Sequence, residues 1–583
     1  MSMKTIAGRI GTSVVSTGIL CGLILGAVPA DAQNAGTNTS PQVRNADNPE
    51  VISTGPKLPY RSRMFPYSSL EEALERAENS SYVIALKNWE SAPSVDGTEF
   101  KTQFKYRYAW DNRAVIFCID DVSSSFTLRV NDTEVGYSQN GAGRNEFDIT
   151  EFVHDDYNSV SVLVHDGAAV QRIERSRRAA SPRFRTASVI TQPTVRIDDV
   201  FTDVTFDERA AYVSVDVVMQ SIMLNPKEYV VVCELFDPSG RSISRTQKTL
   251  NTTMKSRDAV HFVVEVPEPL RWTHETPDLY TLVVSSRYEG RNMEFLSFKT
   301  GLRESHFQDG QLFIGEFPVI LRGVRYTSTD GSAGNVVADR LDRLKNDGYN
   351  CIIVDDGPQP EAFYDVCDSI GLYVCDATSI NTGGVPATMR ASENPSNNPL
   401  WRDAYVDRTR AMYGASHLHP SVVIYSPARN SHNGYCLYES YVVLKELSDA
   451  PVYYAEADGY WNNDIVPETL FHAPAHTVAG GLDVRPIRDG REIVFVVDNV
   501  GDLRPIEGTY KLELKSGRKV SDTTIGELKL SAGESTELRY ALPPQDVAKG
   551  SVILEISVKK RGGLQSGGKV SDMYDTFSYT YKL

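Results

Sequence analysis

Acidic side chains follow several strand-like runs in the second half of the chain. These acids are Asp355, Asp356, Asp376, Glu456 and Asp458. Two carboxyl groups in one cleft can act as a general acid and as a base or nucleophile when their surroundings separate their pKa values. Asp356 and Glu456 are the pair that we select as candidate catalytic carboxylates. The alternative interpretation is that these acids cap helices or line a solvated surface.

Three histidines, His417, His419 and His432, raise the question of a metal site. A zinc site needs three or four ligands that converge on one point. His419 begins a His-Pro-Ser turn, and the other two lie on loops at opposite ends of the strand-like run that follows it. We therefore expect no metal at these histidines.

The segment 419–434 would position the most informative of these polar groups. It reads H-P-S-V-V-I-Y-S-P-A-R-N-S-H-N-G, and its apolar, β-branched run at 421–425 predicts a buried strand entered from a turn. The polar residues that follow would lie at the carboxyl end of that strand. In a parallel α/β barrel this end carries the chemistry.

Alternating strands and helices around this segment predict an α/β region from about residue 309 onward. The expected strands are 310–324, 350–354, 372–377, 421–425 and 451–456, and the expected helices are 335–345, 360–370, 401–413 and 436–447. Short alternating strands over 81–193, 195–303 and from 482 to the end predict β-sandwiches on either side of this region.

Composition excludes some classes of function. The chain has 583 residues and a formal charge of −16, which argues against nucleic acid as a general partner because phosphate binding needs a basic face. Lys4 and Arg9, an apolar run at 14–28 and the small-x-small sequence Ala30-Asp31-Ala32 predict a signal peptide and export. The six cysteines after that segment match no metal spacing, and we expect buried free thiols. A disulfide between Cys351 and Cys375 is the alternative. We expect no cofactor.

Several motifs resemble glycoside hydrolase family 2, the group of β-galactosidases and β-glucuronidases. The resemblance is carried by 122–131 with 135–139 and 146–150, by P-E-P-L-R-W at 267–272 with P-D-L-Y at 277–280, and by the segment that starts at His419. It implies a jelly-roll domain, an immunoglobulin-like sandwich and a TIM-type barrel, whose last helix the sequence F-H-A-P-A at 471–475 resembles. The barrel would be shortened, because the α/β pattern stops near residue 465 whereas a full barrel needs about 250 residues.

The resemblance also implies the loss of the family's chemistry. The proton-donating Glu aligns with Asn430, beside Arg429, and we find no segment that resembles the one carrying the nucleophile. Retaining hydrolysis needs two carboxyl groups about 5–5.5 Å apart, and an amide cannot exchange a proton near neutral pH. The metal-ligating Glu and His align with Asn381 and Gly383, so we expect no magnesium site. Three further site positions are changed, at Thr327, Ile353 and Asp356.

An arginine-rich loop at 171–185 replaces an acid and an aromatic residue that the resemblance implies near the sugar. Arg175, Arg177 and Arg178 are our candidate binding residues there, since guanidinium groups suit anions and carboxylate-rich partners. The alternative is a solvated loop that balances an acidic neighbour. Tyr425 and Trp461 are our candidate glycan-contacting aromatics.

These observations give the following expected organisation. It comprises a signal peptide (1–32), an N-terminal arm (33–80), a jelly-roll domain like those that bind sugars (81–194), an immunoglobulin-like sandwich (195–305), a truncated TIM-type barrel (306–480) and a C-terminal immunoglobulin-like sandwich (481–583).

Three functions stay open at this point. The first is an exported pseudoenzyme that binds or scaffolds an envelope protein, in the periplasm, at the outer membrane or outside the cell. Strand edges near Val319 and Pro451 would need cover, from a partner or from the neighbouring sandwich. The second is a carbohydrate-binding protein that keeps the sugar cleft. The third is an active glycosidase with relocated carboxylates. Peripheral membrane association and the oligomeric state stay open.

Overall fold

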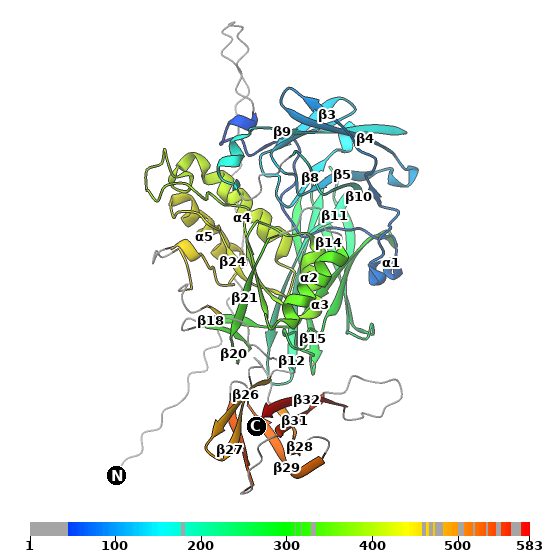
Figure 1. Ribbon diagram of the computed structural model, residues 1–583. Helices are drawn as coiled ribbons and strands as arrows, with labels where there is room; N and C mark the ends of the chain where they lie inside the picture. Colours follow the sequence, from blue (N-terminus) through cyan, green and yellow to red (C-terminus); the bar gives the residue numbers. More distant parts are fainter. Residues whose placement is uncertain are drawn as a thin grey trace, which may run out of the picture. The chain divides into compact units, whose positions relative to one another are not determined.

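The computed structural model describes residues 45–175, 181–308, 311–315, 317–327, 334–457, 462–465, 470–472, 482–499, 506–516, 519–531, 534–543, 550–560 and 573–583 (Figure 1). The expected signal peptide lies outside these residues. Within them, all six cysteines are buried and free, as expected, so the alternative Cys351–Cys375 bridge is not formed. None of the helices in these ranges combines the length and the apolarity needed to cross a membrane.

The first β-sandwich consists of a six-stranded and a four-stranded sheet, with strand orders β1-β7-β6-β9-β4-β3 and β2-β10-β5-β8. Alternate residues of β9 point into the core, so the sequence period of two produces one buried face. Phe117, Phe126 and Phe147 fill the space between the sheets. The strands are β1 Ser53–Thr54, β2 Val83–Ala85, β3 Glu90–Ser94, β4 Gly97–Lys105, β5 Arg113–Asp120, β6 Phe126–Val130, β7 Thr133–Ser138, β8 Arg144–Asp148, β9 Tyr157–His165 and β10 Thr186–Pro193.

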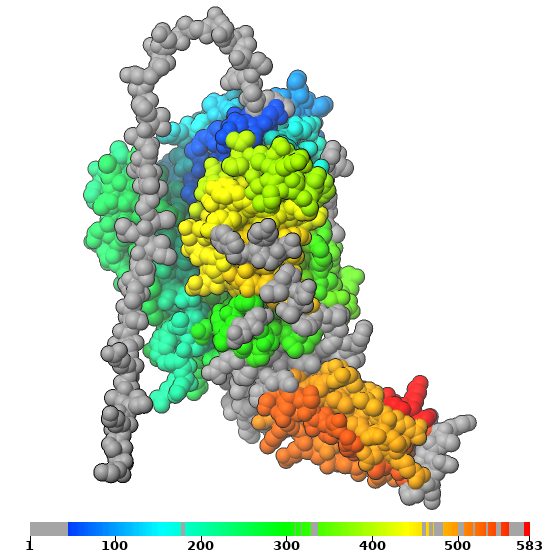
Figure 2. All heavy atoms as spheres, turned by 90° about the vertical axis from the view of Figure 1, so that its left-hand side faces the viewer, coloured from blue at the N-terminus to red at the C-terminus, as the bar shows by residue number. Residues whose placement is uncertain are grey.

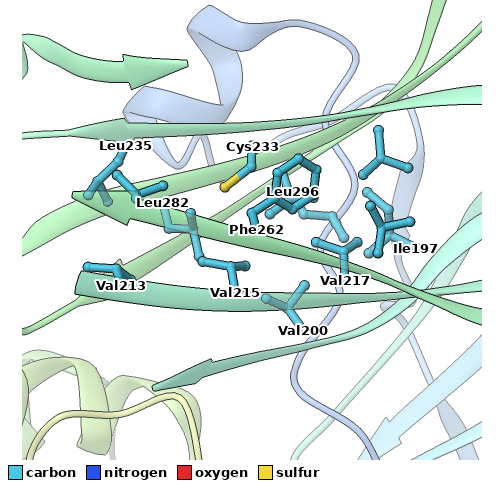
Figure 3. Packing of buried hydrophobic residues seen from close by; sticks show 14 of the residues in the cluster. Ile197, Val200, Val213, Val215, Val217, Cys233, Leu235, Phe262, Leu282 and Leu296 are labelled. Atoms are coloured by element: carbon cyan, nitrogen blue, oxygen red, sulfur yellow. The ribbon is translucent and has the colours of Figure 1, made fainter. Parts of the chain in front are cut away.

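The second β-sandwich packs sheet β11-β12-β15 against sheet β14-β13-β16-β17. Figure 3 shows its core, in which Val213, Val215 and Val217 of β12 face Leu235 and Leu282 of the opposite sheet. The strands are β11 Val195–Phe206, β12 Ala210–Ser221, β13 Lys227–Phe236, β14 Ser242–Thr252, β15 Arg257–Pro267, β16 Tyr280–Tyr288 and β17 Arg291–Thr300.

The α/β region begins with a small antiparallel sheet of β18 Ser305–Gln308, β19 Gln311–Ile314 and β20 Phe317–Val319. A five-stranded sheet of order β24-β23-β22-β21-β25 follows, and its strand pairings are all parallel. Its strands are β21 Leu321–Tyr326, β22 Cys351–Val354, β23 Tyr373–Ala377, β24 Val422–Ser426 and β25 Phe471–His472. The helices are α2 Gly334–Asn346, α3 Glu361–Ile370, α4 Arg402–Ser416 and α5 Tyr435–Leu447. All four expected helices are confirmed.

Two expectations for the end of this region are wrong. Residues 451–456 do not form a strand: Val452 makes one β-bridge to Tyr425, and a 3-10 turn, Ala455–Ala457, follows. Residues 471–472 are not helical but form β25, which pairs with β21. The residues that would follow in the expected helix lie outside the described ranges.

These two short segments lie along the sheet edges that we expected to need cover from a partner or from the neighbouring sandwich. The Tyr453 amide donates to the Tyr425 carbonyl at 2.9 Å along β24, and β25 lies along β21. The inner face of the sheet is filled by Tyr453, Ile465 and Leu470. The chain's own residues therefore cover part of each edge, opposite Tyr425 on β24 and opposite Leu321 and Arg322 on β21.

The last β-sandwich consists of sheets β26-β27-β30 and β29-β28-β31-β32. Its core contains only its own residues, among them Phe495, Leu512 and Leu554. The strands are β26 Leu482–Asp489, β27 Glu492–Asn499, β28 Ile506–Ser516, β29 Lys519–Leu530, β30 Ser535–Ala541, β31 Ser551–Lys560 and β32 Met573–Lys582.

The N-terminal arm joins the first sandwich to the α/β region. Figure 2 shows the blue arm against the yellow-green surface that includes α4, where the Tyr60 hydroxyl donates to Asp407 Oδ2 at 3.0 Å. Further along, Arg61 is buried between Glu146 of the first sandwich and Asp198 of the second. The arm ends in helix α1, Leu70–Glu75, which Ser69 caps by accepting from the Glu72 amide.

Candidate functional site

A polar pocket of about 360 Å³ lies where strands β21 to β24 end. It is lined by Arg325, Thr327, Asp355, Asp356, Asn381, Asn430 and Glu456. Six of these residues lie at or after the ends of successive parallel strands, and Glu456 lies in the 3-10 turn Ala455–Ala457, so the fold brings together side chains that are far apart in the sequence. The pocket contains both carboxylates that we selected, Asp356 and Glu456, and the two amides at changed family positions.

Asn430 connects the strand β24 to the opposite side of the pocket. Its backbone N–H donates to Glu456 Oε1 at 3.0 Å. Its φ is +47°, in the left-handed region that asparagine tolerates better than most residues. An asparagine therefore suits the backbone conformation at this position. Its side-chain amide supplies no proton for acid catalysis.

The carboxylates of the pocket differ in their partners. Asp355 forms an ion pair with Arg325, with 2.8 Å between Oδ1 and Nη2. Asp356 accepts a hydrogen bond from Gln359 Nε2 at 3.2 Å. Glu456 Oε2 is buried and has no hydrogen-bond partner among the described residues. Glu456 is thus the pocket carboxylate whose hydrogen-bonding capacity the described protein satisfies least.

Arg429 lies beneath the pocket rather than in it. Its guanidinium is buried and donates to the Val354 carbonyl at 2.9 Å, to Ser426 Oγ at 2.9 Å and to Cys375 Sγ at 3.2 Å. It thereby ties together the ends of three neighbouring strands. A guanidinium keeps its charge at any ordinary pH, so Arg429 cannot act as a general acid.

The residues at the expected metal positions do not fit a divalent cation. Asn381 Oδ1 accepts from the Gly383 amide at 3.0 Å, so this oxygen is already engaged. Gly383 offers no side-chain ligand, and a Cβ atom there would collide with Asn430 Nδ2. An amide nitrogen that donates hydrogen bonds fills the space, whereas Mg²⁺ and Ca²⁺ need oxygen ligands.

The arginine-rich loop of the first sandwich reaches this same place. Glu174 forms a parallel β-bridge with Asn381, and Arg175 Nη1 donates to the Gly383 carbonyl. Glu174 is buried and pairs with Arg408 of α4 at 2.5 Å. Sequence reasoning missed this pair, because nothing in the spacing links two residues of different domains. Arg177 and Arg178 lie outside the described residues.

The structure contradicts the expected role of Tyr425. Its side chain is only 4% exposed and its ring packs on Tyr413 of α4, with ring centroids 5.7 Å apart. Successive residues of a strand point to opposite faces, and Tyr425 faces the helices rather than the pocket. It cannot contact a glycan there. Trp461 lies outside the described residues.

Asp376 is buried away from the pocket and is not a catalytic candidate. It accepts from the Tyr364 hydroxyl at 2.9 Å, and burial raises the pKa of its carboxyl to about 6. His419 Nδ1 lies 2.6 Å from Asp368 Oδ2, which fixes the His-Pro-Ser turn. His417 contacts Ser62 instead, at 2.8 Å. Asp458 lies outside the described residues.

Comparison with known proteins identifies the family of this site. The family model described as the TIM barrel domain of glycosyl hydrolases family 2 matches residues 306–472, and a second model of glycosyl hydrolases family 2 matches 195–303. The chain belongs to glycoside hydrolase family 2. The jelly-roll, sandwich and shortened-barrel architecture is the fold class expected from the sequence.

Curated relatives of this family 2 chain are β-galactosidases. The β-galactosidase of Photobacterium profundum is 31% identical over 350 residues, which are 58% of this chain and 33% of that protein. The β-galactosidase of Priestia megaterium is 26% identical over 382 residues, which are 62% of this chain and 37% of that protein. The match thus spans about a third of the relatives' length.

Solved structures of family 2 enzymes share the fold. The crystal structure of Bacteroides uniformis β-glucuronidase superposes with a TM-score of 0.56, at 14% sequence identity, and covers 83% of this chain and 74% of that one. A family 2 member from Bacteroides cellulosilyticus gives a TM-score of 0.55 at 14% identity, with coverage of 82% and 76%. At this level of identity the likeness concerns the architecture alone.

Proposed function

We propose that this chain is an exported, non-hydrolytic member of family 2 that binds carbohydrate at the mouth of its shortened barrel. The observation that carries the proposal is a polar pocket of about 360 Å³ at the strand ends, with Asn430 at the acid/base position. Its volume falls within the usual range for small-molecule sites. Its amides, hydroxyl and carboxylates offer the donors and acceptors that sugar hydroxyls need.

The absence of hydrolysis follows from the chemistry at Asn430. Cleavage of a glycosidic bond needs a group that protonates the leaving oxygen and a carboxylate that attacks the anomeric carbon. An amide does neither. The relatives named β-galactosidases make a β-galactoside the first ligand to test.

Two measurements on the purified chain test the proposal. Isothermal titration with isopropyl β-D-thiogalactoside should show saturable binding that weakens at least tenfold in Asn430→Ala, and p-nitrophenyl β-D-galactoside should not be cleaved. Asn292→Ala, at the surface of the second sandwich, is the control and should bind like the wild type. The absence of binding to a panel of galactosides, glucosides and glucuronides would remove the proposal.

A second candidate function is hydrolysis by relocated carboxylates. It is favoured by one observation, namely that Asp356 and Glu456 line the same pocket. It predicts turnover of the aryl galactoside that is lost in Asp356→Asn and in Glu456→Gln. Glu393→Gln, on an exposed loop, is the control that should keep full activity. Wild-type turnover that survives both pocket substitutions would point to a contaminating enzyme.

Export and an envelope partner remain part of the proposal. The leader-like residues 1–32 support export to the periplasm, the outer membrane or the cell exterior. Cell fractionation with and without the leader tests this part. Affinity capture from the native envelope tests for a scaffolding partner.

A further inference from the structure

The mouth of the barrel has a fixed positive charge at the position where the resemblance implies a metal ion. We propose that Arg175, a residue of the first sandwich, takes the place of that cation and holds the pocket loop 381–384 in position without a metal. The part of this proposal that concerns ligand affinity rests on the proposed carbohydrate-binding function. The part that concerns the loop does not.

The loop 381–384 does not offer the converging oxygen ligands that a divalent cation needs. A bound ion would need oxygen atoms that converge, but Asn381 Oδ1 turns back to accept from the Gly383 amide. The Asn430 amide nitrogen lies against Gly383, so that a donor rather than an acceptor faces the space. No group of at least three acidic, histidine or cysteine ligands among the described pocket residues lies close enough together to hold an ion.

Arg175 makes the contacts to this loop that a cation would otherwise supply. Its guanidinium Nη1 donates to the Gly383 carbonyl, and its backbone N–H donates to the Asn381 carbonyl at 2.9 Å. A Cβ atom on Gly384 would lie 3.1 Å from the same Nη1. The guanidinium therefore lies directly against two glycines of the loop, and the absence of side chains there makes room for it.

The residues next to Arg175 in the chain hold it in place. The Asn381 backbone N–H donates back to the Ile173 carbonyl at 2.7 Å, so the two segments pair on both sides of Glu174, the residue next to the arginine. Glu174 is anchored by its buried ion pair with Arg408, and it also accepts from Ser379 Oγ at 3.2 Å. Because a guanidinium is always charged, the site needs no ion from solution.

The consequence is that Asn381 and Asn430 acquire their positions in the pocket through Arg175. Both amides line the pocket. Asn381 belongs to the loop that Arg175 holds, and Asn430 contacts that loop. Arg175 itself does not line the pocket, so it is a positioning residue. Lysine retains the charge but cannot reproduce the fork of a guanidinium, so Arg175→Lys should restore only part of the effect.

The experiment compares the full-length wild type with Arg175→Met, Arg175→Lys and the control Arg172→Met, an exposed arginine on the same loop. Each protein is studied in excess EDTA and in millimolar Mg²⁺ or Ca²⁺. The wild type should show the same melting temperature and the same affinity for isopropyl β-D-thiogalactoside in all three buffers. Arg175→Met should lose about tenfold in affinity, and added metal should not restore it.

Hydrogen exchange supplies a readout that needs no ligand. The amides of residues 381–384 should exchange at least tenfold faster in Arg175→Met than in the wild type, at an intermediate rate in Arg175→Lys, and unchanged in Arg172→Met. Unchanged exchange in Arg175→Met, or a wild type that Mg²⁺ or Ca²⁺ stabilises, would overturn the proposal. If no galactoside binds to any of the proteins, the proposed function fails while the exchange and metal measurements still decide the role of Arg175.

Discussion

At the scale of single residues, Asn430 has a backbone conformation that suits an asparagine better than a glutamate. Its φ of +47° is costly for residues other than glycine and asparagine, by about 1–2 kcal/mol. Asn430→Glu should therefore be less stable than the wild type by about that amount, whereas Asn430→Gly should not. Urea denaturation midpoints check this prediction, and the aryl galactoside assay should show no activity in Asn430→Glu. Equal stability together with restored turnover would contradict it.

Asp376 is a second residue with a consequence that can be measured. Burial raises the pKa of its carboxyl from 3.8 to about 6, so the folded state favours the protonated form. Its contribution to stability is complete below pH 3.8 and is lost as the pH rises through about 6. Each pKa unit corresponds to about 1.4 kcal/mol, so the loss is about 3 kcal/mol.

The substitution Asp376→Asn should remove this loss, since an amide stays neutral. The free energy of unfolding of the variant, relative to that of the wild type, should rise by about 3 kcal/mol between about pH 4 and pH 7. Urea denaturation across this range measures the difference, in which the other titrating groups cancel. Asn292→Ala, an exposed substitution that changes no titrating group, is the control and should show no such rise. A difference that does not change with pH would contradict the assignment.

At the scale of elements, the cover of the β21 edge depends on the fit of β25 against β21. A Cβ atom on Gly323 would lie 2.5 Å from Phe471 Cδ1 and 2.8 Å from Ile353 Cδ1. Gly323→Val should cost about 1–3 kcal/mol through overpacking. It should also displace β25 and expose the edge of β21, which invites association through unpaired backbone groups. Sedimentation velocity should then show concentration-dependent dimers or larger species.

The double variant Gly323→Val/Phe471→Ala provides the control, because removal of the ring makes room for the valine. Its stability should exceed the sum expected from the two single variants, which is the signature of residues in contact. Additive losses, together with a Gly323→Val protein that stays monomeric, would show that β25 does not protect the edge.

Elements with a strong local pattern could be predicted from the sequence, and elements defined by distant partners could not. The helices around Leu341 and Phe363 follow from the spacing of their apolar residues, and β12 follows from its alternation. The position of β25 depends on a gap beside β21 that only the folded chain shows. The strand at 421–425 followed from its apolar run, but the prediction that Tyr425 contacts a glycan was wrong, because the sequence does not show that this residue faces the helix α4.

The candidate site likewise contains residues whose positions could be predicted from the sequence and residues whose positions could not. Asp356, Asn381 and Asn430 could be placed near one another, because residues that follow successive parallel strands meet at one end of the sheet. Glu456 lines the same pocket from a 3-10 turn and not from the predicted strand. The contact of Arg175 with Gly383 could not, since it joins two domains through a loop of no regular period. The burial of Arg429 beneath the pocket could not be predicted either, because its acceptors lie on three different strands.

At the scale of the whole molecule, the arm residue Arg61 joins the first two sandwiches. Its side chain is 3% exposed and lies 2.7 Å from Glu146 and 3.3 Å from Asp198. Arg61→Met would remove a buried cation that Glu146 shares with Arg144 and that Asp198 shares with Arg196 and Arg257. It would also remove the donor to buried Gln192 Oε1, and the loss of such buried hydrogen bonds costs about 1–3 kcal/mol. Thermal denaturation should show a fall in melting temperature. Arg245→Met, which breaks an exposed pair, should change stability by less than about 1 kcal/mol.

The C-terminal sandwich should fold independently of the site. Among the described residues, its core is made of its own side chains, such as Leu482, Phe495 and Ile556, and its two sheets contain only its own strands. A self-contained core in a segment of this size is sufficient for autonomous folding. Residues 482–583 expressed alone should therefore give a dispersed NMR spectrum and a cooperative unfolding transition.

The complementary protein, which ends at residue 481, should keep the galactoside affinity of the full chain, because every residue that lines the pocket precedes Ile465. A C-terminal fragment that unfolds without cooperativity would show that its core needs the rest of the chain. Loss of affinity in the shortened protein, with its melting temperature unchanged, would show that the sandwich contributes to the site itself.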